Sequence, residues 1–125
     1  MEVIPNQLIK FVPSVRLCKQ LPLEEFKNTE FVWFKWSLSA RDWQLSTRYC
    51  MRCYEDPLYY PAPLAEELWE KLPWASVDSG LTVKGKQWFQ ASKSLKTEPY
   101  MFDSPLCNSL AEALCAAYLG EKSVD

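Results

Sequence analysis

The segment from Pro61 to Leu72 constrains the fold most, because it is the clearest amphipathic helix in the sequence. Leu64, Leu68 and Leu72 recur at every fourth position, and charged residues occupy the positions between them. Proline suits the first turn of a helix but cannot continue one, so we expect the helix to begin at this segment's first proline and to end before Pro73. The leucine stripe then requires a sheet or a second helix to cover it.

The aromatic content is the unusual part of the composition. The chain of 125 residues has the length of one domain, and its 48% hydrophobic and 24% charged residues are ordinary for a globular protein. Six Trp, six Tyr and six Phe stand beside only three Gly. Aromatic side chains bury a large area each, so we expect one domain over residues 1–125 with a dense core, and any surplus aromatics on a binding face.

The strongest strand prediction is Glu30 to Leu38, which is rich in aromatic and β-branched residues. Alternation places Trp33 and Lys35 on one face. The opposite face, which we expect to be the core face, carries Val32, Phe34, Trp36 and Leu38. The segment Trp43 to Met51 alternates in the same way and is predicted to be its hairpin partner.

The remaining elements are predicted to be short. We expect an N-terminal helix from an N-cap at Ser14 to Leu21, a connector at Cys53–Tyr60 and a loop at Trp74–Gly80. Two strands, Leu81–Val83 and Gln87–Ala91, are expected around a turn at Lys84–Lys86, and Tyr100–Phe102 is expected as an edge strand. The last helix is predicted to be capped by Asp103 or Ser104 and ended by Gly120. Together these predict an α+β two-layer sandwich, with two or three helices on one face of a mainly antiparallel sheet of about four strands.

A short internal echo is consistent with that architecture. LCKQLP at residues 17–22 and LWEKLP at residues 68–73 each end a predicted helix, and a predicted hairpin follows each of them. Two helix-then-hairpin units with a closing helix would produce this pattern. The common Leu-Pro ending of helices explains it equally well.

Several residue types needed for catalysis are missing or badly placed. Histidine is absent, which removes the usual general base, the usual zinc ligand and the usual switch near neutral pH. The adjacent carboxylate pairs do not converge on a substrate, the serines lack a nucleophile elbow, and the glycines are too few for a phosphate-binding loop. We therefore predict a protein that is not an enzyme and that uses no cofactor.

Cys50 and Cys53 form a CxxC pair, which can indicate half of a zinc site or a redox pair. Zinc requires four ligands, and the other thiols, Cys18, Cys107 and Cys115, form no second pair of this kind. A redox pair begins at a helix N-terminus, whereas this one follows a predicted strand. We interpret the five thiols as structural and reduced and predict no metal, with a metal site and redox chemistry as the less favoured readings.

The absence of targeting signals suggests a cytoplasmic protein. The sequence contains no run of 18 apolar residues that could span a membrane. Its first residues, MEVIPNQLIKFVP, are too polar and too interrupted by proline for a signal peptide. The net charge of -2 argues against a general binder of polyanions. It is unevenly divided: eight Lys/Arg against five Asp/Glu up to Cys53 leave +3, and six against eleven from Tyr54 onward leave -5.

Two parts of the sequence carry a resemblance to known proteins. VPSVRLCKQLP followed by FKNTEFVW resembles the N-terminal region of a set of short proteins of phages and bacterial mobile elements. APLAEELWEKLP and DSPLCNSLAEALCAAYL are similar to segments of small phage proteins with a helix, strands and a terminal helix. The resemblance covers about half of the chain. It implies an accessory phage or prophage protein and carries no catalytic residues.

The predicted first hairpin is the candidate binding site. Its residues are one aromatic and four cationic side chains: Trp33, Lys35, Arg41, Arg48 and Arg52. Aromatics that stack on bases, flanked by cations that meet phosphates, are what single-strand binders present on a sheet. The alternative is that Phe31 and Trp33 lie beneath the N-terminal segment or in a dimer interface, and we favour this alternative because the charge is negative and no Lys/Arg cluster exists.

These observations predict a non-catalytic accessory protein that binds another protein through aromatic anchors, with inhibition of a host or defence system as one use. The partner is unidentified, and a homodimer would also account for the surplus aromatics. Binding of single-stranded nucleic acid or a nucleotide through the hairpin is the alternative function.

Overall fold

Two antiparallel sheets of three strands each, together with three helices, make up the computed structural model, which describes residues 11–35, 42–47, 58–72, 75–96, 98 and 100–120. The first sheet contains β1 (Phe31–Lys35), β2 (Gln44–Thr47) and β3 (Leu58–Ala62). The second contains β4 (Ser76–Leu81), β5 (Gln87–Ser94) and β6 (Met101–Asp103). The helices are α1 (Val15–Cys18), α3 (Ala65–Glu70) and α4 (Leu110–Leu119).

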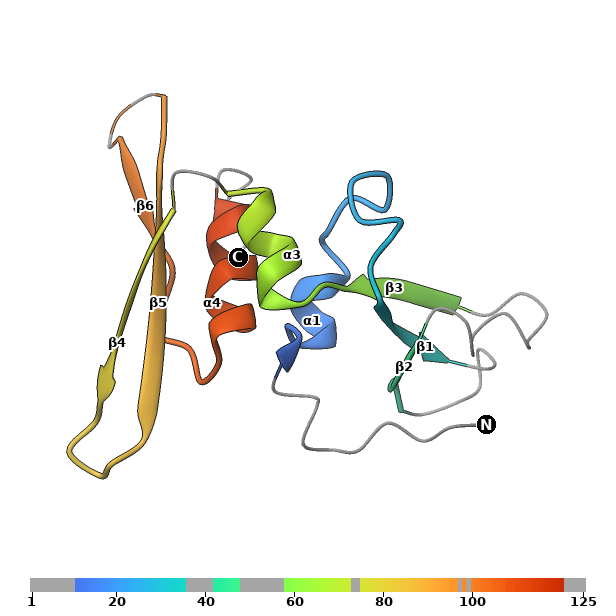
Figure 1. Cartoon of the computed structure of the whole chain (residues 1–125), viewed down its shortest axis with the longest axis horizontal. Coiled ribbons are helices and arrows are strands. Elements are labelled where there is room, and N and C mark those ends of the chain that lie inside the picture. Colours follow the sequence, from blue (N-terminus) through green and yellow to red (C-terminus); the bar gives the residue numbers. More distant parts are fainter. Residues whose placement is uncertain are drawn as a thin grey trace.

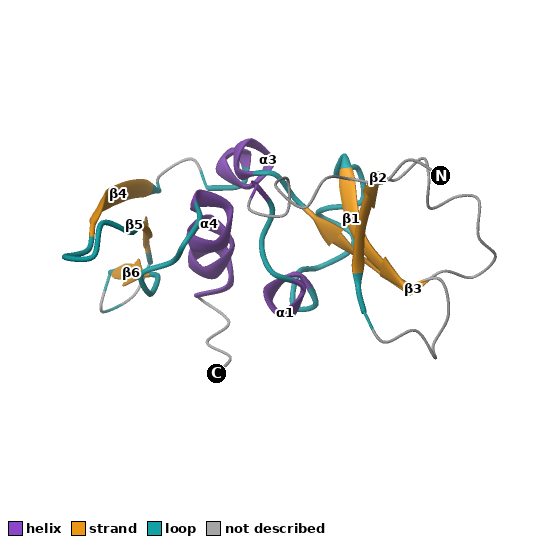
Figure 2. Cartoon of the chain, turned by 90° about the horizontal axis from the view of Figure 1, so that it is seen from below, coloured by secondary structure: helices purple, strands orange, loops and turns teal. Residues whose placement is uncertain are grey.

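The helices lie between the two sheets (Figures 1 and 2). This arrangement confirms the α+β class, but the single sheet of about four strands is wrong, since the strands divide into two sheets. One core cluster joins all of these layers, and its buried members include Leu17 of α1, Trp33 of β1, Leu68 of α3, Ala91 of β5 and Leu114 of α4. None of the helices in the described part of the chain is long and apolar enough to cross a membrane.

In the first sheet, β1 is the central strand and pairs with both β2 and β3. The hairpin of β1 and β2 is as predicted. The predicted connector is wrong at its end, because the chain from Leu58 onward forms β3 on the other side of β1. Pro61, opposite Val32, is compatible with this strand because β3 is an edge strand, where a missing N–H costs no ladder hydrogen bond on the open side.

The predicted helix at 61–72 is therefore shorter than expected. A residue that precedes proline is held in extended conformation, so the prolines at 61 and 63 keep this stretch out of the helix. Leu64 is still extended (φ -71°, ψ 161°), and its N–H donates to the Glu67 carboxylate at 2.8 Å. Leu68 and Leu72 are buried as the leucine stripe predicts.

In the second sheet, β5 is the central strand. The predicted turn is present, with Gly85 at a φ of 83° that favours glycine. The predicted loop at 74–80 is wrong over residues 76–80, which form most of β4. The predicted edge strand is present as β6.

The last helix begins five or six residues later than expected. Ser104 caps no helix, and its Oγ instead accepts from the N–H of Ala91 at 3.0 Å. Cys107 forms a bridge with Phe89 of β5. The segment between β6 and α4 thus continues along β5, and the N-cap is Ser109, whose Oγ accepts from the N–H of Glu112 at 3.2 Å.

The predicted core face of β1 is buried, but the opposite face is buried as well and is the one that meets the main core. Trp33 belongs to the main core, and Phe31 packs against it. Val32 and Phe34, on the predicted core face, form a separate small cluster with Tyr59. Both faces of this strand are buried, so alternation alone could not distinguish the face that meets the helices from the other.

Candidate functional site

Trp33, the aromatic residue of the predicted hairpin site, is not at the surface. Its side chain is 6% exposed, and its Nε1–H donates to the carbonyl oxygen of Pro13 at 2.9 Å. This is the alternative weighed from the sequence, in which the ring lies beneath the N-terminal segment. No face of the indole is left open for a base to stack on.

Lys35 lies close to a different aromatic ring, that of Trp43, with its Nζ 4.9 Å from the ring centroid. The three arginines of the predicted site, Arg41, Arg48 and Arg52, lie outside the described residues. The predicted set is therefore not brought together around Trp33 by any contact in the described part of the chain.

Trp43 instead forms the centre of a small group that we call the Trp43 cluster, made of Trp43, Tyr60, Lys19 and Lys35. The Nζ of Lys19 is 5.2 Å from the Trp43 ring centroid. The Tyr60 ring lies 5.2 Å away from the indole at an interplanar angle of 51°. The end of α1, both strands of the first hairpin and β3 therefore meet at one half-buried indole.

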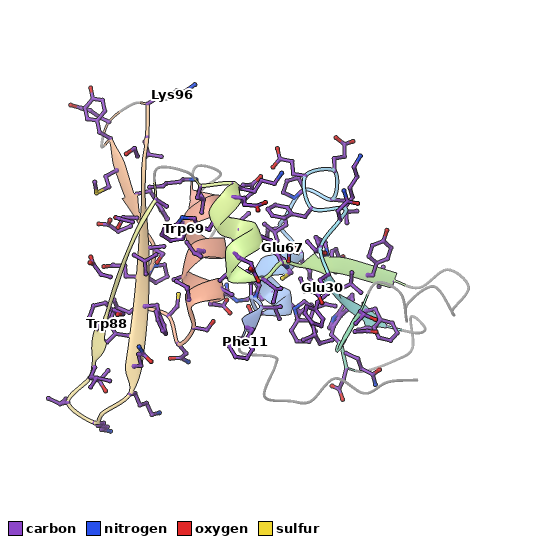
Figure 3. The ribbon with its side chains drawn as sticks, in the orientation of Figure 1. Phe11, Glu30, Glu67, Trp69, Trp88 and Lys96 are labelled. Carbon is purple, nitrogen blue, oxygen red and sulfur yellow. The ribbon has the colours of Figure 1, made fainter. Side chains whose placement is uncertain are left out.

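A mainly apolar cavity lies between α3, the start of α4 and Phe11. Phe11 and Trp69 of its lining are labelled in Figure 3. We call this cavity the apolar cleft. Its volume is about 490 Å³. Its lining is formed by Phe11, Phe31, Leu64, Ala65, Glu66, Trp69, Leu110 and Leu114. Phe11 and Trp69 are 50% and 42% exposed, so two large rings meet solvent at the mouth of the cleft.

The charge around this cleft is negative. Glu66 is the charged residue of its lining, and Glu70 is exposed one turn further along the same helix. The Glu67 carboxylate is engaged by the Leu64 N–H. Lys71, the cation of this helix, has its Nζ 5.8 Å from the Phe26 ring centroid. The cleft thus combines an apolar floor with a carboxylate at its edge.

A second, more polar cavity of about 640 Å³ lies between α1 and α4. At its wall, the two carboxylate oxygens of Glu112 accept from the backbone N–H and the hydroxyl of Ser14, at 2.8 and 2.9 Å. This contact fastens the N-terminus of α1 to α4. The predicted N-cap, Ser14, therefore holds the cap position while its side chain serves a tertiary contact.

The thiols near this cavity are not activated. Burial, with a smaller contribution from the Glu112 carboxylate, raises the pKa of Cys18 and Cys107. Burial and the neighbouring Cys18 thiol raise the pKa of Cys115 further. Thiols with raised pKa values are poor nucleophiles and poor metal ligands. In the described ranges no group of His, Cys, Asp or Glu is arranged to hold a metal ion.

Two surface features were missed by reasoning from the sequence. Trp69 lies among the charged residues of an amphipathic helix, and a large aromatic in that position was the available signal for the apolar cleft. Trp43 was placed correctly on the hairpin, but its approach to Lys19 of the first helix depends on the tertiary fold.

No protein-family model matches this chain, and neither the curated proteins nor the solved structures contain a significant match to it. The resemblance to small phage and mobile-element proteins therefore stays a prediction.

Proposed function

We propose that this protein binds another protein through the apolar cleft and catalyses no reaction of its own. The observation that carries the proposal is Trp69, which is 42% exposed on a helix whose leucines are buried. A tryptophan at the edge of an apolar hollow is the residue type that most often dominates the binding energy of a protein interface. Its indole adds a large apolar area that a partner can cover.

The shape of the cleft supports a small apolar insertion by the partner. A volume of about 490 Å³ accommodates a few side chains rather than a whole element. Leu64, Leu110 and Leu114 provide an aliphatic floor, and Phe11 and Trp69 provide aromatic sides. An apolar side chain that enters this hollow is transferred out of water. The burial of apolar surface is the main favourable term in association.

The charges support a partner segment with cationic flanks. Glu66 lines the cleft and Glu70 lies one turn along on α3, so a Lys or Arg beside the inserted side chain would meet a carboxylate. Complementary charges of this kind increase the association rate and select the partner more than they increase affinity. We therefore propose a short apolar segment with adjacent Lys or Arg residues as the occupant.

The raised pKa values of the described thiols support the non-catalytic part of the proposal, because protonated thiols do not attack a substrate. The resemblance to phage and mobile-element proteins supports the biological setting. In that setting the partner is a protein of the bacterial host, and occupation of its apolar segment would inhibit a host process or a defence system.

A comparison of variants in a pull-down from a bacterial host, after nuclease treatment and at high salt, tests this proposal. The full chain should retain a stoichiometric protein, and Trp69→Ala should weaken the interaction by about 2 kcal/mol or more, roughly thirtyfold. Leu81→Ala is the matched control, since Leu81 is 70% exposed on β4 and lies in neither cavity lining.

Cross-linking of the retained protein should identify an apolar segment with an adjacent Lys or Arg, and Glu66→Gln should slow its association. Retention that Trp69→Ala leaves unchanged would contradict the proposal. A homodimer that Trp69→Ala converts to a monomer in light scattering would contradict it as well, because the cleft would then be filled by a second copy.

A further inference from the structure

The Trp43 cluster brings together two cations that have no anionic partner among the described residues. Lys19 and Lys35 each lie over the Trp43 ring, at 5.2 and 4.9 Å from its centroid. The two ammonium groups are therefore no further apart than the sum of these distances, about 10 Å. Within the ranges that the structure describes, neither lysine forms an ion pair with a carboxylate.

The backbone fixes this arrangement. The register that pairs Phe34 with Gln44 brings Lys35 next to Trp43 at the end of the hairpin. Tyr60 comes from β3 on the other side of β1, and Lys19 is the C-cap of α1. Lys35 and Tyr60 therefore lie in strands, Trp43 immediately precedes β2, and Lys19 ends a helix.

The positive charges of the cluster are only partly compensated by their surroundings among the described residues. Two like charges near one ring repel each other, and the negative face of the indole compensates only part of that repulsion. The Nε1–H of Trp43 makes no hydrogen bond to any residue in the described part of the chain. Asp42, exposed and adjacent in the sequence, is the acidic residue beside it. An anion that accepts from both lysines would complete the site.

We propose that the Trp43 cluster binds single-stranded nucleic acid. A base stacks on the indole and displaces a lysine from its face, and the displaced ammonium groups bind the phosphates on either side of that base. The half-buried aromatic pair of Trp43 and Tyr60 favours this ligand over an acidic peptide, which would use the two cations and leave the rings idle. This site is separate from the apolar cleft, since no residue of the cluster lines the cleft.

Fluorescence anisotropy with a labelled oligothymidylate of about 15 nucleotides tests the proposal, with salt varied between roughly 50 and 200 mM. The full chain should bind it, and affinity should fall as salt rises. Lys19→Ala combined with Lys35→Ala should weaken binding by about tenfold or more at low salt and should reduce the slope of log K against log salt by about 1.4.

The matched control is Lys84→Ala combined with Lys86→Ala, which removes the same charge from the exposed β4–β5 turn. It should change affinity by less than about twofold, because these two lysines do not contact the bound strand and their removal lowers only the general attraction that net charge produces. Equal losses in the two double variants would overturn the proposal. So would the absence of binding at low salt.

Trp43→Leu separates stacking from charge. It should weaken binding by about tenfold while the salt slope stays unchanged, because the lysines remain. Far-ultraviolet circular dichroism checks that each variant folds. If the tryptophan variant does not fold, the lysine variants still decide the test, because they alter only exposed and half-buried side chains. Mononucleotides should bind more weakly than the oligomer. A polyglutamate peptide that binds as tightly as the oligomer would overturn the assignment to nucleic acid.

Discussion

The two sheets have the same number of strands and use them in opposite ways. In the first sheet, the middle of β1 is buried on both faces, since Trp33 contacts the main core and Phe34 forms the second cluster. In the second sheet, β5 covers α4 with one face, and β4 is mostly exposed. The comparison teaches that the first sheet buries aromatic residues fully, whereas those of the second, including Phe89 beside the main core, are only half-buried.

The residues at equivalent places illustrate the difference. Trp33 at the centre of β1 is 6% exposed and hydrogen-bonded to Pro13. Trp88, on β5, is half-buried, and its ring covers the position where Gly80 of the neighbouring strand has no side chain. Trp33 is therefore a core residue, while Trp88, labelled in Figure 3, shields a strand pair at the surface.

The largest expected effect comes from exchanging these tryptophans for alanine. Trp33→Ala should lower the free energy of unfolding by about 3–5 kcal/mol, because it empties a core position and leaves the Pro13 carbonyl without its indole donor. Trp88→Ala should cost less than half as much. Urea denaturation followed by circular dichroism measures both. Equal losses would break the comparison, since the second sheet would then be as dependent on its aromatic residue as the first.

A smaller effect is expected at Lys93, where the second sheet meets α4. This side chain is 8% exposed, and its Nζ donates to the carbonyl oxygen of Tyr118 at 2.8 Å, in the last turn of that helix. Lys93→Met keeps the apolar stem and removes the charged donor, so thermal unfolding should show a loss of about 1.5–3 kcal/mol. Lys84→Met in the exposed turn is the control and should leave stability unchanged. If Lys93→Met leaves the free energy of unfolding unchanged, apolar packing alone joins this sheet to the helix.

The smallest effect concerns alkaline pH and the thiols buried between the sheets. Burial raises the pKa of Cys18 and Cys115 above the ordinary value of 9.0 that they have when unfolded. The folded state therefore binds more protons than the unfolded state above about pH 9, and stability should fall there by about 1.4 kcal/mol per pH unit for each thiol.

Denaturation midpoints between pH 8 and 10 measure this slope, and Cys18→Ala should reduce it while stability below pH 9 shows only the cavity cost. If Cys18→Ala leaves the slope of stability against pH unaltered, groups other than the thiols cause the loss of stability at alkaline pH.

Local signals in the sequence predicted several elements well. Alternation identified β1 and β2, glycine identified the Gly85 turn, and Ser14 marked the start of the first helix. These predictions succeeded because each depends on backbone preference or on neighbours a few residues away. The prolines at 61 and 63 were misread because proline suits both a helix start and an edge strand.

The candidate site was predictable only in part. Lys35 was selected from the sequence and does lie beside an aromatic ring, but that ring is Trp43 and not Trp33. Alternation divides β1 into two faces without saying which segments cover them. The covering of Trp33 by Pro13 and the approach of Lys19 to Trp43 both join residues about 20 positions or more apart, and no local pattern records such contacts.

By itself, then, the sequence determined the α+β class, the antiparallel hairpins and the dense aromatic core, because periodicity and composition act locally and additively. Only the tertiary structure decided that the strands form two sheets around the helices, that Trp33 is buried, and that Trp69 and the Trp43 cluster meet solvent. The physical reason is that burial of a side chain is a property of what packs over it, and the covering segments come from other parts of the chain.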